Sequence, residues 1–292
     1  MNYTIQNDSL TVTVGELGAE LISVMGNDGF EYIWQSPSKE FWGGHAPLLF
    51  PHCGRILNSE YTYNGNTYKM GSHGFARGSH FELLTRESDR LIFSISDSET
   101  SRENYPFSFE LVADYRLENR TLFVNFTVQN TGKTELPYML GWHPAFSLDT
   151  SFGAQINDFS IEFPGKKSLV HYPLVNGPFV SREGISYPIS DSKYNLSEDE
   201  IYKNDTMIFM ETGGVAKLFS PKARHSVTLS YGENLPYFCI WKYQSHDANF
   251  ICLEPWSDVP SDGTSPEVLE TKKMSRLQPG ARTHYSYRVD FT

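Results

Sequence analysis

Hydrophobic and polar side chains alternate along most of this chain, and long stretches with helical spacing are absent. The alternation is plain in residues 9–14, and it is longest in residues 108–117 and 121–129. Successive side chains of a strand point to opposite faces of a sheet, so a period of two is typical of strands with one buried face. These segments predict antiparallel strands, and the last two predict one long hairpin that turns at residues 118–120.

Two further hairpins are predicted from turn residues. Residues 61–63 and 67–69 flank Asn64-Gly65, a pair that tolerates the positive φ angles of tight hairpin turns. Residues 81–86 and 91–96 predict a second hairpin. Other β-rich segments are residues 206–210, 226–231, 238–243, 250–253 and 285–291. We expect only two short helices, within residues 192–202 and 267–274.

Many short strands without alternating helices favour an all-β fold, a large antiparallel β-sandwich or barrel. Glycine, proline and serine are distributed over many turns and do not gather into a linker. All-β domains often reach the length of this chain, which has 292 residues. The sequence therefore predicts one domain over residues 1–292.

Composition and charge limit the classes of molecule that this protein is expected to bind. The 24 Lys and Arg residues against 35 Asp and Glu give a net charge of −11, which disfavours nucleic acids and anionic membrane surfaces. No run of 18 apolar residues and no secretory signal is present, and the three cysteines form no CxxC pair. We expect a cytoplasmic protein without disulfide bonds, present as a monomer or homodimer.

Four polar clusters lie among glycines, prolines and aromatic residues, where rigid scaffolds tend to present functional side chains. They occupy residues 43–55, 71–78, 141–146 and 252–256. A single histidine in such a setting is more often a core residue. Glu254, however, continues an apolar strand, and a carboxylate there would have its pKa raised by desolvation. The histidines show no HxH or HxxxH spacing, so no metal site is predicted.

The order of these motifs resembles the aldose 1-epimerase (galactose mutarotase-like) family. The motifs are Phe-Pro at 50–51 with Gly-Arg-Ile at 54–56, His-Gly-Phe-Ala-Arg at 73–77, Gly-Trp-His-Pro-Ala-Phe at 141–146 and Leu-Glu-Pro-Trp at 253–256. The resemblance extends from residues 15–21 to residues 277–280. It implies a β-sandwich of the supersandwich type with a sugar-binding cleft on one sheet.

The resemblance also implies roles for individual residues. His143 resembles the general acid that protonates the sugar ring oxygen, and Glu254 resembles the general base that removes the proton from the anomeric hydroxyl. His73 resembles the second histidine of the site, and Arg55 the sugar-binding arginine. Asp205 is the nearest match to the sugar-binding aspartate of the family.

The chemistry of anomer exchange suits these side chains. Opening a hemiacetal removes a proton from O1 and gives one to the ring oxygen, so an acid and a base must flank the sugar. Glutamate and histidine, with ordinary pKa values of about 4.3 and 6.5, can be tuned toward neutrality. The reaction requires no redox centre, nucleotide or metal, so we expect no cofactor and a monosaccharide as the partner.

Among the aromatic residues, the five tryptophans are candidates for a platform under the sugar, although packing is the more common role. Trp142 and Trp256 are favoured because each lies next to or near a proposed catalytic residue. The tryptophans are Trp34, Trp42, Trp142, Trp241 and Trp256. Beside Arg55, residues His45, His52 and Cys53 receive no role. The remaining histidines are interpreted as surface or structural residues, namely His80, His171, His225, His246 and His284.

Three alternatives remain open. Arg55 and Arg77 would suit the phosphate of a hexose 6-phosphate, but the related phosphate-specific mutarotases tend to have an arginine before the Gly-Gly pair, where this chain has Trp42. This favours a free aldose such as galactose or glucose. A carbohydrate-binding protein without activity is the second alternative. Glycoside hydrolysis, with Asp258 as the second carboxylate, is the third, although residues 258–263 are more typical of a turn.

Overall fold

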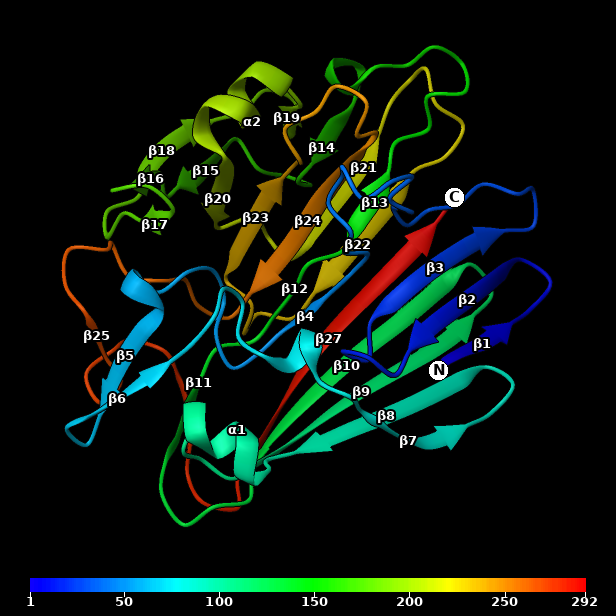
Figure 1. Cartoon of the computed structure of the whole chain (residues 1–292). Helices are drawn as coiled ribbons and strands as arrows, with labels where there is room; N and C mark the ends of the chain where they lie inside the picture. Colours follow the sequence, from blue (N-terminus) through cyan, green and yellow to red (C-terminus); the bar gives the residue numbers. More distant parts are fainter.

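The computed structural model describes residues 1–292, and most of its strands lie in two large antiparallel sheets (Figure 1). One sheet has nine strands. In order across this sheet they are β19 (Lys193–Asn195), β14 (Ser160–Glu162), β21 (Val215–Phe219), β22 (Val227–Tyr231), β27 (Arg282–Phe291), β10 (Thr121–Asn130), β9 (Phe109–Glu118), β8 (Arg90–Ser96) and β7 (Glu82–Arg86). The predicted all-β sandwich with large antiparallel sheets is confirmed.

The other large sheet has eight strands and holds the candidate site. In order they are β18 (Ile185–Pro188), β15 (Ser168–His171), β20 (Thr206–Met210), β23 (Tyr237–Trp241), β24 (Phe250–Trp256), β12 (Gly141–Trp142) and β4 (Leu48–Leu49), with β13 (Ala145–Ser147) also paired to β24. All seven residues of β24 are buried. This central strand is therefore covered on both faces.

Smaller sheets surround these two layers. They consist of β1 (Asn2–Gln6), β2 (Leu10–Gly15) and β3 (Leu21–Gly26); β25 (Glu267–Val268), β5 (Glu60–Tyr63) and β6 (Asn66–Lys69); β11 (Leu136–Tyr138) and β26 (Ser275–Leu277); and β16 (Leu174–Val175) and β17 (Phe179–Val180). The helices are α1 (Glu99–Asn104), α2 (Glu198–Asn204) and three 3-10 turns, η1 (Leu57–Ser59), η2 (Ala76–Gly78) and η3 (Ile156–Asp158). Neither α-helix has the length and apolar character needed to cross a membrane.

The predicted hairpins are confirmed. β9 and β10 pair along their full length, with Leu117 opposite Leu122, and buried residues alternate with less buried ones in both strands. β5 and β6 meet at Asn64 and Gly65, whose φ angles are +50° and +74°. These elements follow from local pattern because the turn fixes their register.

The helix predictions are only partly correct. A helix in residues 267–274 is wrong: β25 pairs there with β5, and the buried Glu267 forms an ion pair with Lys272. Tertiary pairing has outweighed the local helical pattern. In residues 192–202 the helix begins only after the N-cap Ser197, because residues 193–195 form β19. Helix α1 was not predicted, although Ser98 and Ser101 cap its start reciprocally.

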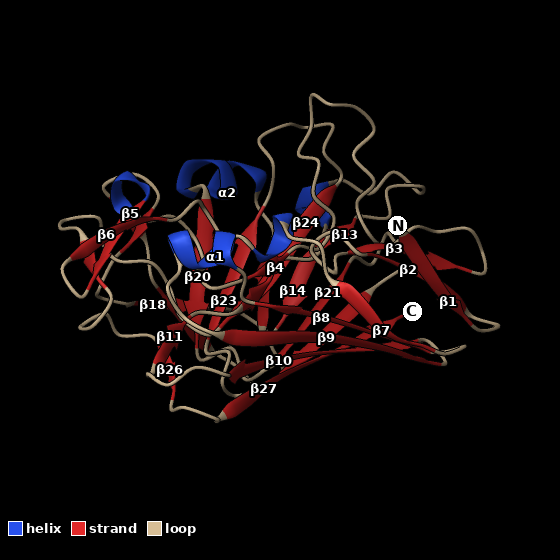
Figure 2. Cartoon of the chain, turned by 60° about the horizontal axis from the view of Figure 1, so that its bottom comes forward, coloured by secondary structure: helices blue, strands red, loops and turns tan.

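The main hydrophobic core lies between the two large sheets. In Figure 2 the long strands β9, β10 and β27 lie below β20, β23 and β24. Successive side chains of β24 point to opposite faces of the sheet. Ile251 and Leu253 point into this core, whereas Cys252 and Trp256 belong to smaller clusters on the opposite face. Glu254 has the same parity as Cys252 and Trp256. The sheet therefore presents Glu254 on the face that points away from the main core.

Candidate active site

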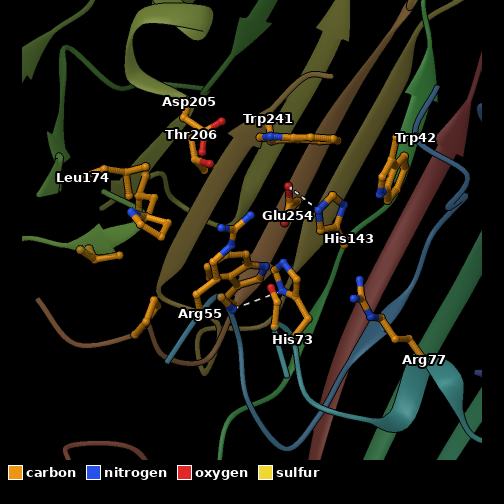
Figure 3. A pocket seen from close by; sticks show the side chains of 17 residues that line it. Trp42, Arg55, His73, Arg77, His143, Leu174, Asp205, Thr206, Trp241 and Glu254 are labelled. Carbon is orange, nitrogen blue, oxygen red and sulfur yellow. Dashed lines mark hydrogen bonds and ion pairs between the residues drawn. The ribbon is translucent and has the colours of Figure 1, made fainter. Parts of the chain in front are cut away.

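A cavity of about 310 Å³ lies over this outer face of the eight-stranded sheet (Figure 3). Seven of the eight site residues proposed from the sequence line it, from segments far apart in the chain. These seven are Arg55, His73, Arg77, His143, Asp205, Glu254 and Trp256. The fold therefore gathers the separate motifs at one place.

Glu254 and His143 face each other across neighbouring strands. Gly141 pairs with β24 two residues beyond Glu254, and Ala145 pairs with β24 two residues before it, so His143 lies opposite Glu254. The His143 Nε2 atom is 3.3 Å from the Glu254 Oε1 atom. Strand register thus brings an imidazole and a carboxyl group together although they are more than a hundred residues apart in the sequence.

Burial controls the ionisation of this pair. Glu254 is 1% exposed, its Oε2 atom has no hydrogen-bond partner, and burial raises its pKa well above the ordinary value. Burial also lowers the pKa of His143 to about 3. The two shifts favour a pair that holds one proton between its members. That proton can sit on the carboxyl group or on the imidazole, two forms that differ by transfer across the 3.3 Å contact.

Aromatic rings enclose His143. The Trp42 ring stacks on it at a centroid distance of 5.1 Å, and the Trp241 ring meets it edge-on at 5.6 Å. The His73 ring lies at 5.5 Å. Figure 3 shows Glu254 and His143 between Trp241 on one side and His73 on the other. These rings keep water from the imidazole, which is why its charged form is disfavoured.

His73 is held by an unusual backbone turn. Its φ is +64° and that of Gly74 is +71°, and a Cβ atom on Gly74 would lie 2.2 Å from the Phe50 carbonyl oxygen. The Gly54 N–H donates to His73 Nδ1 at 3.2 Å, and the His73 N–H donates to the Gly54 carbonyl at 2.8 Å. Because Nδ1 accepts, the neutral ring carries its proton on Nε2. Burial holds the pKa of His73 well below its ordinary value, with a smaller contribution from His143.

Two arginines and one aspartate line the same cavity without protein partners. Arg55 and Arg77 are both exposed, and neither forms an ion pair or a side-chain hydrogen bond. In Figure 3 they lie on opposite sides of His73. Asp205 is the C-cap of α2 with φ 61° and ψ −61°, a strained conformation for a residue with a side chain. These three charged groups are free to bind a ligand.

The proposed role of Trp142 is wrong. Trp142 is 0% exposed, its Nε1 donates to the Ala46 carbonyl at 3.0 Å, and its ring packs on Tyr287 in the main core. Neighbouring residues of a strand point to opposite faces, so adjacency to His143 places Trp142 away from the cavity. Trp256, two residues from Glu254, lies on the correct face and lines the cavity.

Sequence reasoning missed other lining residues. Trp42 and Trp241 line the cavity, whereas the sequence alone favours a packing role for both. Leu174 and Val180 enter from the β16–β17 hairpin, which carried no chemical motif. For Trp42, its position directly before Gly43-Gly44 in the first polar cluster was an available signal. For the hairpin no local signal exists, since its place in the cavity depends on tertiary packing.

Several polar residues near the motifs serve other purposes. His52 is buried beside Glu267, with 3.4 Å between Nε2 and Oε2, and does not line the cavity. The Nδ1 atom of His45 lies 2.7 Å from a backbone carbonyl oxygen. Asp258 accepts hydrogen bonds from the backbone N–H and the hydroxyl of Ser275, both at 3.0 Å, so it caps a distant segment and not its own turn. Asp258 is not a second carboxylate of this cavity.

The family follows from comparison with known proteins. A model of the aldose 1-epimerase family matches residues 1–267. The chain belongs to this family. Protein LacX of Lactococcus lactis subsp. lactis is 30% identical over 99% of both chains. This assignment supports a function of the mutarotase type and confirms the resemblance drawn from the motifs.

Solved structures of similar proteins agree with the fold. A galactose mutarotase related enzyme from Lactobacillus acidophilus is 33% identical, with a TM-score of 0.92 over 100% of this chain and 97% of that one. A galactose mutarotase-like protein from Lactobacillus casei is 29% identical, with a TM-score of 0.91 over the full length of both chains. These likenesses confirm the galactose mutarotase-like sandwich.

Proposed function

We propose that this protein is an aldose 1-epimerase that interconverts the α and β anomers of a free aldose such as galactose or glucose. The observation that carries the proposal is the contact between His143 and Glu254, 3.3 Å apart on the floor of a sugar-sized cavity. An acid and a base placed together in this way match the two proton transfers of ring opening. Family membership supports the same activity.

The reaction needs one proton to be taken up and one to be released. With the shared proton on the imidazole, the Glu254 carboxylate removes the proton from O1 while His143 gives its proton to the ring oxygen. The C1–O5 bond breaks and C1 becomes an aldehyde carbon. Rotation about the C1–C2 bond and reclosure, with the two residues in exchanged roles, gives the other anomer and restores the starting pair. Each positioned acid or base contributes about 10²–10⁴ to the rate.

Other residues bind the sugar in this proposal. The His73 Nε2–H group donates a hydrogen bond to the ring oxygen or a neighbouring hydroxyl, because Gly54 occupies Nδ1. Trp256 lines the cavity and offers its indole ring to the apolar C–H face of the sugar. Arg55 and Asp205, both without partners, bind hydroxyl groups away from C1.

Polarimetry tests the proposal. Freshly dissolved α-glucose and α-galactose should reach anomeric equilibrium faster with the wild-type protein, and Glu254→Gln and His143→Asn should each remove most of this acceleration. Asp258→Asn is a matched control, because that carboxylate lies outside the cavity and should not be needed. Unchanged rates in both cavity variants would contradict the residue roles. Sugar binding without any acceleration by wild type would identify a binding protein.

A phosphorylated aldose is the second candidate substrate. The supporting observation is that Arg55 and Arg77 both line the cavity without an acidic partner, since guanidinium groups bind phosphate through paired donors. A parallel assay with glucose 6-phosphate separates the two substrates. A higher kcat/KM for glucose 6-phosphate, lost selectively in Arg77→Ala, would favour the phosphorylated sugar.

A further inference from the structure

All three cysteines of the chain lie around Glu254. Cys252 precedes it by two residues on β24, and Cys239 is its cross-strand partner on β23. Cys53 lies against the neighbouring strand, because a Cβ atom on Gly141 would be 3.0 Å from its Sγ atom. The thiols are free and buried. Burial raises the pKa of each thiol, and the nearby Glu254 charge adds to this effect.

One of these thiols approaches the acid and base closely. The ligand atoms of His143, Cys252 and Glu254 all lie within 4.8 Å of one another. Cys252 and Glu254 share a strand face, and His143 lies opposite Glu254 in the segment that joins β12 to β13, so the backbone fixes all three positions. Cys252 itself is opposite Ala145 and is buried in a cluster that also contains Trp34 and Phe250.

The three donors form a ligand set typical of one kind of ion. Imidazole nitrogen, thiolate sulfur and carboxylate oxygen together suit Zn²⁺, whose bonds to them are about 2.0–2.3 Å long. Two buried atoms of the group, Glu254 Oε2 and His143 Nδ1, have no hydrogen-bond partner in the protein. Tetrahedral bonds of this length place the donor atoms about 3.5 Å apart, so atoms that now lie up to 4.8 Å apart must approach by about 1 Å. His143 and Glu254 line the cavity, whereas Cys252 is fully buried and does not.

We propose that His143, Cys252 and Glu254 form a binding site for a thiophilic divalent cation such as Zn²⁺, and that the bound ion stops anomer exchange. The ion occupies the lone pairs that the base and the acid need for proton transfer. Binding displaces the Cys252 thiol proton and the proton shared by the pair, with no change of oxidation state. The inhibition rests on the function proposed above, whereas the metal site does not.

Cobalt spectroscopy tests the site without using activity. Tag-free protein is titrated with Co²⁺, which replaces Zn²⁺ and reports a thiolate ligand through a near-ultraviolet charge-transfer band. We expect the band in wild type and in Cys53→Ala, a control that removes a buried thiol outside the donor set. Cys252→Ser and Cys252→Ala should lack it. Wild-type protein without the band, or Cys252 variants that retain it, would overturn the proposed ligands.

Polarimetry with Zn²⁺ tests the consequence. Zn²⁺ should inhibit wild type and Cys53→Ala, and EDTA should restore the rate. The concentration for half-inhibition should rise at least about tenfold in the Cys252 variants, each measured against its own metal-free rate, because even a lost outer-shell partner weakens metal sites by about 10–100-fold. Equal inhibition of wild type and Cys252 variants would overturn the proposal. A protein that shows the cobalt band but never accelerates anomer exchange would contradict the proposed function and leave the metal site supported.

Discussion

Asp205 combines a strained backbone with an unpaired carboxylate, and replacing it by glycine separates these two properties. Its φ of 61° and ψ of −61° at the end of α2 lie where residues with a Cβ atom are strained. Such strain costs about 1–3 kcal/mol, and glycine adopts positive φ without it. Glycine also gives the unfolded chain more freedom, which costs about 0.5–1 kcal/mol. Asp205→Gly should therefore stabilise the protein by about 1 kcal/mol.

The same substitution should weaken sugar binding. A hydrogen bond from a sugar hydroxyl to a carboxylate is worth about 1.5–3 kcal/mol, so its loss should raise KM roughly 10-fold to 100-fold. Asp205→Ala removes the carboxylate but keeps the strain, so it should raise KM equally without stabilising the protein. Both outcomes together would show that Asp205 lowers stability in exchange for binding.

Denaturant unfolding and polarimetry measure the two effects separately. The free energy of unfolding should be higher in Asp205→Gly than in Asp205→Ala by about 1 kcal/mol, which is the strain of about 1–3 kcal/mol less the roughly 0.5–1 kcal/mol that glycine costs through the unfolded chain. In thermal unfolding, 1 kcal/mol corresponds to about 2 °C for a chain of this size. Equal stability of the glycine and alanine variants would refute the strain. An unchanged KM in both would refute the role of the carboxylate.

The remaining predictions concern the pair, the turn before η2 and the tryptophan over His143. The pH profile of the rate should be bell-shaped, because activity requires that His143 and Glu254 share one proton. Burial raises the pKa of Glu254 and lowers that of His143 to about 3, so activity should persist well below pH 6.5. An acid limb at the ordinary pKa of histidine would contradict this. Gly74→Ala should lower kcat and destabilise the protein by at least about 2 kcal/mol in denaturant unfolding, since the added Cβ atom would lie 2.2 Å from a carbonyl oxygen. Gly78→Ala is the control and should be nearly neutral, because the space around Gly78 is open. Trp42→Ala should expose His143 to water and raise its pKa, so the acid limb of the pH profile should move to higher pH. An unmoved acid limb would show that the stacked Trp42 ring does not lower the pKa of His143.

Local sequence patterns predicted much of the fold. Alternation and turn residues predicted the β9–β10 and β5–β6 hairpins, because neighbouring strands joined by short turns take their register from the turn itself. The helix expected in residues 267–274 failed for the opposite reason. Pairing of β25 with β5 and the contact between Glu267 and Lys272 are long-range or buried interactions that a local pattern does not contain.

The sequence by itself determined which residue types carry chemistry: the ordered motifs around His73, His143 and Glu254 were sufficient to identify the family resemblance. Only the tertiary structure decided how they meet. Pairing of β24 with the segment around His143 sets the 3.3 Å contact, and strand alternation sends Trp142 into the core while Trp256 lines the cavity. Register between distant strands and the face on which a side chain emerges are set by packing of the whole sheet. For that reason the ionisation of the pair, which depends on burial, was decided by the fold.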